Sequence, residues 1–311
     1  MPQILIGVLY AKSAFIHDTT KVSVMKNISK FLFLFVALAF CQQAIPQPLP
    51  NPDFLDGAGS HTYKSIDGVA LRLHIFQPAD AKVESRAAIV FFFGGGWRQG
   101  SVNQFIPHAE HLSNLGITAV IADYRVFLRH GSTVADAVSD AKSAIRWLRS
   151  HAEQLGIDPQ RIAAAGGSAG GHLAAATATI DGYDSAEEDL SISSRPNALV
   201  LFNPAVNTGR IGESRPAQFL GDAEILSPYH QVGENFVPTL IMHGHDDATV
   251  PYSDVADFCD KVIHLAGDCT LIGYEGATHG FFNKGRDNDR WYHSTIAEMD
   301  MFLTEIGYLS L

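Results

Sequence analysis

The stretch "RIAAAGGSAGGHLAA" (residues 161–175) has the pattern of a buried strand that leads into a helix through a serine flanked by glycines. Its first half is a continuous apolar run, which is typical of parallel strands buried on both faces. Gly166, Ser168 and Gly170 then form G-x-S-x-G, where small neighbours let a serine hydroxyl project from a sharp strand-to-helix turn. The alternative is a glycine-rich helix start with Ser168 as a simple N-cap. The strand context favours the first interpretation and predicts Ser168 as a nucleophile.

Similar apolar runs recur along the chain, at residues 86–93, 116–124, 197–203, 237–244 and 269–276. Amphipathic helical patterns separate them, which indicates a mainly parallel sheet with helices on both faces, that is, an α/β fold. Before these runs, residues 61–80 alternate apolar and polar around Asp67-Gly68, and this predicts an antiparallel hairpin. We expect a single catalytic domain over residues 61–311, preceded by a linker at 45–60.

Two further strand ends carry residues that could complete a catalytic site with Ser168. In open α/β sheets, ligands bind at the carboxyl ends of the strands. Asp246 and Asp247 follow the run at 237–244, and His279 follows the run at 269–276. A serine nucleophile needs a histidine base and an acid that fixes the tautomer of the histidine. Either aspartate could instead cap the next helix, and the weaker candidates for the base are His230, His243 and His245.

The stretch "FFFGGGW" (residues 91–97) follows an early strand. A glycine triplet can be a flexible turn, or it can leave backbone N–H groups bare beside a ligand. Acyl transfer needs donors for the developing oxyanion, from this loop and from the residue after the nucleophile. The position of the triplet favours the second interpretation.

Together these motifs resemble the α/β-hydrolase superfamily, and within it the hormone-sensitive-lipase-like and acetyl-xylan-esterase-like serine esterases. The stretches that carry the resemblance are "FFFGGGW", "ADYRV" (122–126), "GIDPQRIAAAGGSAGGHLAA" (156–175), "HGHDDATVP" and "GATHGFF". The resemblance implies a twisted sheet of about eight strands, and no cofactor or metal. We expect little or no cap, because few residues precede the first strand and the stretch at 204–236 is modest. It also implies the site residues, which are the nucleophile Ser168, the acid Asp247, the base His279, and the oxyanion donors Gly95, Gly96 and Ala169.

Two positions depart from the family pattern. Phe93 stands where the family usually has histidine, so we expect packing to brace the oxyanion loop in place of a side-chain hydrogen bond. Gly167 stands before the serine where the lipase-like branch often has aspartate, which favours the carbohydrate-esterase branch. The resemblance therefore predicts a serine esterase that removes acetyl or feruloyl groups from plant or algal polysaccharides. The alternatives are a general short-chain carboxylesterase or lipase, a serine peptidase, or an inactive binding module.

The N-terminal region predicts export. From Met25 the chain has two lysines, an apolar run at 31–40 and then small and polar residues, which is the layout of a secretory signal peptide. We expect residues 1–44 to be upstream residues plus this signal peptide, with the start at Met25. The mature protein would be secreted or periplasmic and would have no integral membrane segment. A lipoprotein anchored through Cys41 is the alternative, although Phe40 is bulky for that motif.

Composition limits the partners of the chain. The 311 residues are 46% hydrophobic and 18% charged, with a formal net charge of −11. Residues 1–44 hold four lysines and one aspartate, so their removal takes this charge to −14. Such an acidic chain is not expected to bind nucleic acid. Oligomeric state is not predicted.

Export permits disulfides, so Cys259 and Cys269 could form a bridge or remain two buried thiols.

Overall fold

The computed structural model describes residues 50–310, except 81–84 and 235. The predicted signal peptide, Cys41 and residues 45–49 of the predicted linker therefore lie outside the described residues. The first described strand begins at Gly59, close to the predicted end of the linker at residue 60.

An eight-stranded sheet organises the described residues, in the order β1-β2-β4-β3-β5-β6-β7-β8. Strands β1 and β2 form the predicted hairpin, in which Asp67 and Gly68 both have positive φ. Strand β2 pairs antiparallel with β4, and all the following pairs are parallel. The strands are β1 (Gly59–Ile66), β2 (Val69–Phe76), β3 (Arg86–Phe92), β4 (Thr118–Ala122), β5 (Ile157–Gly167), β6 (Ala198–Phe202), β7 (Thr239–Gly244) and β8 (Cys269–Tyr274).

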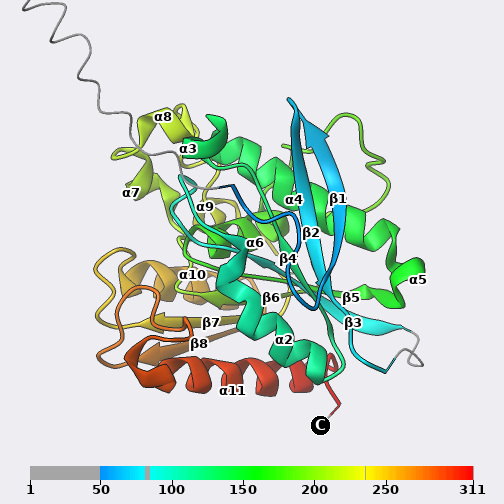
Figure 1. The fold of residues 1–311 in the computed structure, drawn as a ribbon. Coiled ribbons are helices and arrows are strands. Elements are labelled where there is room, and N and C mark those ends of the chain that lie inside the picture. Colours follow the sequence, from blue (N-terminus) through cyan, green and yellow to red (C-terminus); the bar gives the residue numbers. More distant parts are fainter. Residues whose placement is uncertain (1–49, 81–84, 235, 311) are drawn as a thin grey trace, which may run out of the picture. The chain divides into compact units, whose positions relative to one another are not determined.

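Helices cover both faces of this sheet (Figure 1). Helices α2 and α11 lie on one face, and α4, α6 and α10 lie on the other. The helices of at least nine residues are α2 (Ile106–Asn114), α4 (Val134–Ser150), α6 (Ala169–Thr179), α10 (Tyr252–His264) and α11 (Arg290–Glu305). The shorter ones are η1 (Val102–Phe105), α3 (Phe127–His130), α5 (Ala152–Leu155), α7 (Thr208–Gly212), α8 (Pro216–Phe219), α9 (Pro228–Gln231) and η2 (Asp287–Asp289). The predicted α/β-hydrolase architecture is confirmed.

The core explains why the sequence forms these elements. All seven residues of β3 are buried, as expected for an inner parallel strand that is covered on both faces. Every residue of α6 is also buried, which accounts for its almost wholly apolar and small composition. By contrast α4 has a polar face, and a capping box between Thr133 and Asp136 fixes its first turn.

The segment between β6 and β7 contributes only the short helices α7, α8 and α9. This agrees with the expectation of little or no cap. The segment nevertheless lies beside the carboxyl ends of the strands, because Ala205, Ile211 and Arg215 line the same cavity as Ser168. The short helices therefore form one wall of the site.

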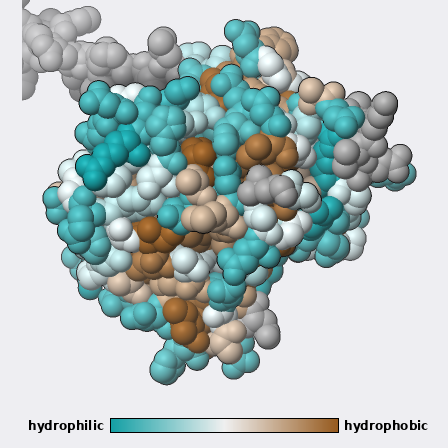
Figure 2. Space-filling model, turned by 90° about the horizontal axis from the view of Figure 1, so that it is seen from below, coloured by the Kyte–Doolittle hydropathy of each residue, from teal (hydrophilic) through white to brown (hydrophobic). Residues whose placement is uncertain are grey.

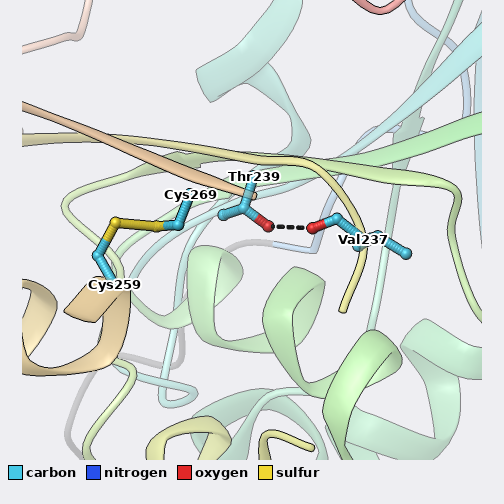
Figure 3. Close-up of a disulfide and its surroundings, with 4 residues drawn as sticks. All are labelled: Val237, Thr239, Cys259 and Cys269. Carbon is cyan, nitrogen blue, oxygen red and sulfur yellow. Dashed lines mark hydrogen bonds between the residues drawn. A yellow bond between two sulfur atoms is a disulfide. The ribbon is translucent and has the colours of Figure 1, made fainter. Parts of the chain in front are cut away.

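A disulfide joins Cys259 on α10 to Cys269 at the start of β8, with 5.6 Å between the Cα atoms (Figure 3). Cys269 pairs in the sheet with Thr239, the first residue of β7, whose hydroxyl donates a 2.8 Å hydrogen bond to the carbonyl of Val237. The bridge thus attaches α10 to the edge strand at the end of the sheet remote from the strands' carboxyl ends.

The surface is mixed on the face shown in Figure 2, where hydrophilic residues separate several hydrophobic patches. Within the described part of the chain, no helix combines the length and the apolar character that are needed to cross a membrane.

Candidate active site

Ser168 occupies a strained turn between β5 and α6. Its backbone has φ 55° and ψ −117°, a combination that a non-glycine residue adopts only where its surroundings enforce it. The flanking glycines make the turn possible. A Cβ on Gly166 would lie 2.4 Å from the backbone of Gly170, and a Cβ on Gly170 would lie 2.0 Å from the carbonyl oxygen of Phe92. The hydroxyl of Ser168 therefore projects from a close contact of three backbone segments.

His279 connects Ser168 to a buried carboxylate. Its Nε2 lies 2.9 Å from the Oγ of Ser168, and its Nδ1 lies 2.7 Å from the Oδ2 of Asp247. The other oxygen of Asp247 accepts hydrogen bonds from the N–H groups of Thr249 and Val250, at 2.8 and 2.9 Å. Burial alone would raise the pKa of Asp247, but these hydrogen bonds, above all that from His279, hold the pKa below its ordinary value. Asp247 is thus an anion that fixes the ring of His279.

The two neighbouring aspartates have different environments in the structure. Asp246 is exposed, and its side chain makes no hydrogen bond with the described residues, whereas Asp247 points inward to His279. The weaker histidine candidates do not bond to Ser168. His243 is buried beside Asp247 and pairs with the carbonyl of Val250 at 2.9 Å, while His245 stacks on the ring of Tyr252.

The glycine triplet forms a loop over the serine with two open N–H groups. The N–H of Gly94 donates a 2.6 Å hydrogen bond to Oε1 of Gln104. The N–H groups of Gly95 and Gly96 have no acceptor among the described residues, and their φ angles of 128° and 64° lie in the region that favours glycine. Ala169 is the first residue of α6, so its N–H is also free of the helix ladder. These groups can serve as oxyanion donors.

The bracing of this loop differs in part from our expectation. Phe93 packs on Tyr124 with ring centroids 4.2 Å apart, so packing does replace the family histidine. Side-chain hydrogen bonds contribute as well, because Arg215 and Gln218 both donate to the carbonyl of Gly96, at 3.0 and 3.1 Å. The expectation of packing without side-chain hydrogen bonds was therefore wrong for the loop as a whole.

Three polar residues that the sequence did not reveal connect the loops. Gln104 donates to Asn283 at 2.9 Å, Asn283 donates to the carbonyl of Gly280 at 2.7 Å, and the N–H of Gly280 donates to Asn203 at 3.0 Å. This chain of bonds joins the oxyanion loop to the residue after His279. No motif marks these residues, and Gln104 and Asn283 are 179 positions apart.

Gly167, the second departure from the family pattern, has a steric cause. A Cβ at this position would lie 2.4 Å from the ring of Phe282. A larger residue before the serine would therefore require this ring, which is almost fully buried, to move.

A cavity of about 1550 Å³ opens over Ser168 and His279. Its walls come from the glycine loop, the segment with α7 and α8, and the loop that follows His279. Among the described residues, no group of three or more His, Cys, Asp or Glu side chains is arranged to hold a metal ion.

A family model described as BD-FAE matches residues 73–262, which is more than half of the chain. The chain belongs to the BD-FAE family. Its similarity to solved structures includes the apo form of Thermogutta terrifontis esterase 2, with 46% identity, a TM-score of 0.82, and coverage of 85% of this chain and 100% of that chain. The resemblance to α/β-hydrolase serine esterases is confirmed.

Curated relatives of this BD-FAE protein are also named as esterases. A probable carboxylic ester hydrolase, LipM of Mycobacterium tuberculosis, is 27% identical, and the match covers 77% of this chain and 59% of LipM. An acetylxylan esterase of Xylanibacter ruminicola is 27% identical over 63% of this chain and 41% of its own length. The chain thus spans about half the length of the curated relatives that it matches.

Proposed function

We propose that this BD-FAE protein is an exported serine esterase that hydrolyses acetyl or feruloyl esters on polysaccharides. The observation that carries the proposal is the hydrogen-bonded series Ser168–His279–Asp247, with Ser168 on the strained turn between β5 and α6. In this arrangement a serine hydroxyl can become a nucleophile, because a base lies within hydrogen-bond distance and an acid orients that base.

The chemistry follows from these contacts. Nε2 of His279 takes the proton of the Ser168 hydroxyl as Oγ attacks the ester carbonyl carbon. The carbonyl oxygen becomes an oxyanion and accepts hydrogen bonds from the free N–H groups of Gly95, Gly96 and Ala169. When the tetrahedral intermediate collapses, the bond to the alcohol oxygen breaks, and His279 returns the proton to that oxygen. Water then repeats these steps on the acyl-enzyme and releases the acid.

The preference for small acyl groups has two supports. The cavity is open, and its wall between β6 and β7 consists of short helices, so the described residues form no long cap that could enclose an acyl chain. Structures of Thermogutta terrifontis esterase 2 are described with propionate and with butyrate bound, and the relative from Xylanibacter ruminicola is named an acetylxylan esterase. A cleft of this kind admits a polysaccharide more easily than an apolar tunnel would.

The proposal of export rests on the sequence from Met25 to Phe40. Intact-mass analysis of protein recovered outside the cytoplasm tests it. We expect cleavage after Ala39 or Ala44. A full-length N-terminus in that fraction would exclude the signal peptide, and a lipid on Cys41 would identify a lipoprotein.

The experiment that tests the activity compares release of acetate and of ferulate from native polysaccharides, with p-nitrophenyl acetate as a simple substrate. We expect Ser168→Ala to lose at least about three orders of magnitude in kcat while its unfolding curve stays unchanged. Ser191→Ala, at an exposed serine, is the matched control. Retention of more than about a tenth of the activity by Ser168→Ala would contradict the mechanism. Activity on p-nitrophenyl esters without release from any polysaccharide would favour a general short-chain carboxylesterase.

A further inference from the structure

The charge of the cleft is opposite to that of the chain. The net charge of the protein is −11, yet the described residues around the cavity that holds Ser168 include several arginines and a single carboxylate, Asp254. The arginines are Arg98, Arg210, Arg215 and Arg286. An acidic protein that concentrates cations around its nucleophile attracts anions to that place.

Only one of these arginines is neutralised. Arg210 pairs with the buried carboxylate of Asp254 at 2.7 Å. Within the described part of the chain, Arg98, Arg215 and Arg286 form no ion pair with any carboxylate. Their charges are therefore available to a ligand in the cavity.

Two of the unpaired arginines flank the reacting groups. Arg215 lies directly on the oxyanion loop, where a Cβ on Gly96 would meet its Nη1 at 2.4 Å. Arg286 follows His279 in the chain and donates a 2.5 Å hydrogen bond to the carbonyl of that residue. Each guanidinium has five N–H donors, so the bonds to backbone leave donors for a ligand.

Arg98 adds a second cation near Arg215. Its guanidinium lies over the ring of Phe127, with 5.6 Å to the ring centroid, and it is exposed in the cavity wall. Arg98 and Arg215 both line the cavity, and the pKa of Arg215 is lowered first by burial and then by the charge of Arg98. Two like charges at an exposed site repel each other weakly, and an anion bound to both relieves that repulsion. Planar guanidinium groups match the geometry of a carboxylate.

We propose that the cleft selects esters whose alcohol part carries carboxylate groups, and that Arg98 and Arg215 bind one carboxylate. Taken with the proposed function, on which it rests, this identifies the substrate class as acetylated saccharides that contain uronic acid. An acetyl group is too small to fill a cavity of about 1550 Å³, so the alcohol part occupies most of it and meets the arginines. Arg286 lines the same cavity and bonds to the backbone of His279, so it is available to a second carboxylate of such a saccharide.

A matched pair of small esters tests this selection. The anionic substrate is 4-acetoxybenzoate, and the neutral one is 4-acetoxybenzamide, which has nearly the same shape. We expect the ratio of their kcat/KM values, anionic over neutral, to fall about tenfold in Arg98→Gln, the loss expected for a charge-assisted hydrogen bond. The control is Arg290→Gln, because Arg290 is an exposed arginine that packs on Trp291 and does not line the cavity. Its ratio should equal that of the wild type.

A binding measurement gives the second, independent readout. Calorimetry on Ser168→Ala should show that trigalacturonate binds more tightly than xylotriose, and the preference should weaken with added salt and in the variant that also has Arg98→Gln. If the enzyme hydrolyses both small esters through Ser168 with the same ratio in Arg98→Gln, the selection is wrong while the proposed function stands. If neither ester is cleaved, the proposed function fails, and the calorimetry alone then decides whether the cleft binds carboxylates. Equal binding of the two saccharides would overturn the inference.

Discussion

The hydroxyl of Tyr124 donates a 2.7 Å hydrogen bond to the carbonyl oxygen of Phe93, the residue that precedes the glycine triplet. Both side chains are fully buried and stacked on each other. This bond satisfies a carbonyl that water cannot reach, at the point where β3 turns into the oxyanion loop. Tyr124 thus fixes the start of the loop through the carbonyl of Phe93. Arg215 and Gln218 fix the loop through the carbonyl of Gly96.

Tyr124→Phe tests this support. The variant keeps the stacked ring but leaves the carbonyl of Phe93 without a partner, which should cost about 1 to 3 kcal/mol in the free energy of unfolding. A less fixed loop should also lower kcat about tenfold on a small acetyl ester, since oxyanion donors act through their preset positions. Tyr292→Phe removes a weaker bond away from the oxyanion loop, 3.2 Å from its hydroxyl to the carbonyl of Pro107 on α2, and should retain kcat. An equal kcat in both variants would show that Tyr124 serves stability only.

A second prediction concerns His108, which is fully buried among aromatic rings and has no hydrogen-bond partner among the described residues on either ring nitrogen. Burial lowers its pKa to about 3. The unfolded chain, with a histidine pKa of about 6.5, binds the proton more readily than the folded protein between pH 6.5 and 3. His108 therefore leaves the free energy of unfolding unchanged above pH 6.5, and lowers it progressively as the pH falls through this window.

His108→Phe should remove that acid sensitivity. At pH 5, about 1.5 pH units below the unfolded pKa, His108 lowers the free energy of unfolding by about 2 kcal/mol relative to neutral pH. We therefore expect the variant to lose about 2 kcal/mol less than the wild type between pH 7.5 and pH 5, as measured by urea unfolding at both values. His264→Phe, at an exposed histidine, is the control. Parallel pH profiles for wild type and His108→Phe would contradict the prediction.

The disulfide gives a third prediction. Cys259 and Cys269 are ten positions apart, so their bond closes a short loop. The chain-entropy model gives about 2 to 3 kcal/mol for a loop of this length. Replacement of both cysteines by alanine should lower the free energy of unfolding by that amount and leave kcat unchanged, because the bridge lies at the other end of β8 from His279. Alkylation of the untreated protein should label neither cysteine, and two labelled thiols would show that the bridge is absent.

The fold could be predicted because its signal is local. Inner strands such as β3 and β6 are buried on both faces, so they appear in the sequence as unbroken apolar runs. The turn at Ser168 could be predicted for the same reason, since its steric demand falls on Gly166 and Gly170, two residues away on either side. The spacing of the family motifs then predicted Asp247 as the acid and His279 as the base.

The bracing of the site could not be predicted because its partners are distant in sequence. Gln104 and Asn283 are 179 positions apart, with the strands β4 to β8 between them in the sequence. The hydrogen bonds from Arg215 depend on the path of an irregular segment. A glutamine or an asparagine in a loop carries no pattern that predicts its partner. At position 93 the family usually has a histidine that braces the oxyanion loop. Several contacts brace the loop in this protein, and of these the sequence showed only Phe93.

The last prediction separates the two adjacent aspartates by function. Only Asp247 reaches His279, with 2.7 Å between Oδ2 and Nδ1, while Asp246 faces solvent. An asparagine at 247 has no charge to stabilise the protonated ring, and its amide can hold the ring in the wrong tautomer, in which Nε2 carries the proton and cannot accept that of Ser168. We therefore expect Asp247→Asn to lower kcat by about three to four orders of magnitude.

Asp246→Asn makes the same chemical change one residue away, and its kcat should fall less than about tenfold, since no contact of His279 is altered. The two variants are purified in parallel and compared on one acetyl ester, with unfolding curves to verify that both are folded.

The stability of the two variants supplies a further distinction. The lowered pKa of Asp247 means that its contribution is present above its unfolded pKa of about 3.9 and is lost as the pH falls through the lower folded value. Asp247→Asn should thus lose stability at neutral pH, whereas Asp246→Asn should not. A dead Asp246→Asn beside an active Asp247→Asn would refute the assignment of the acid.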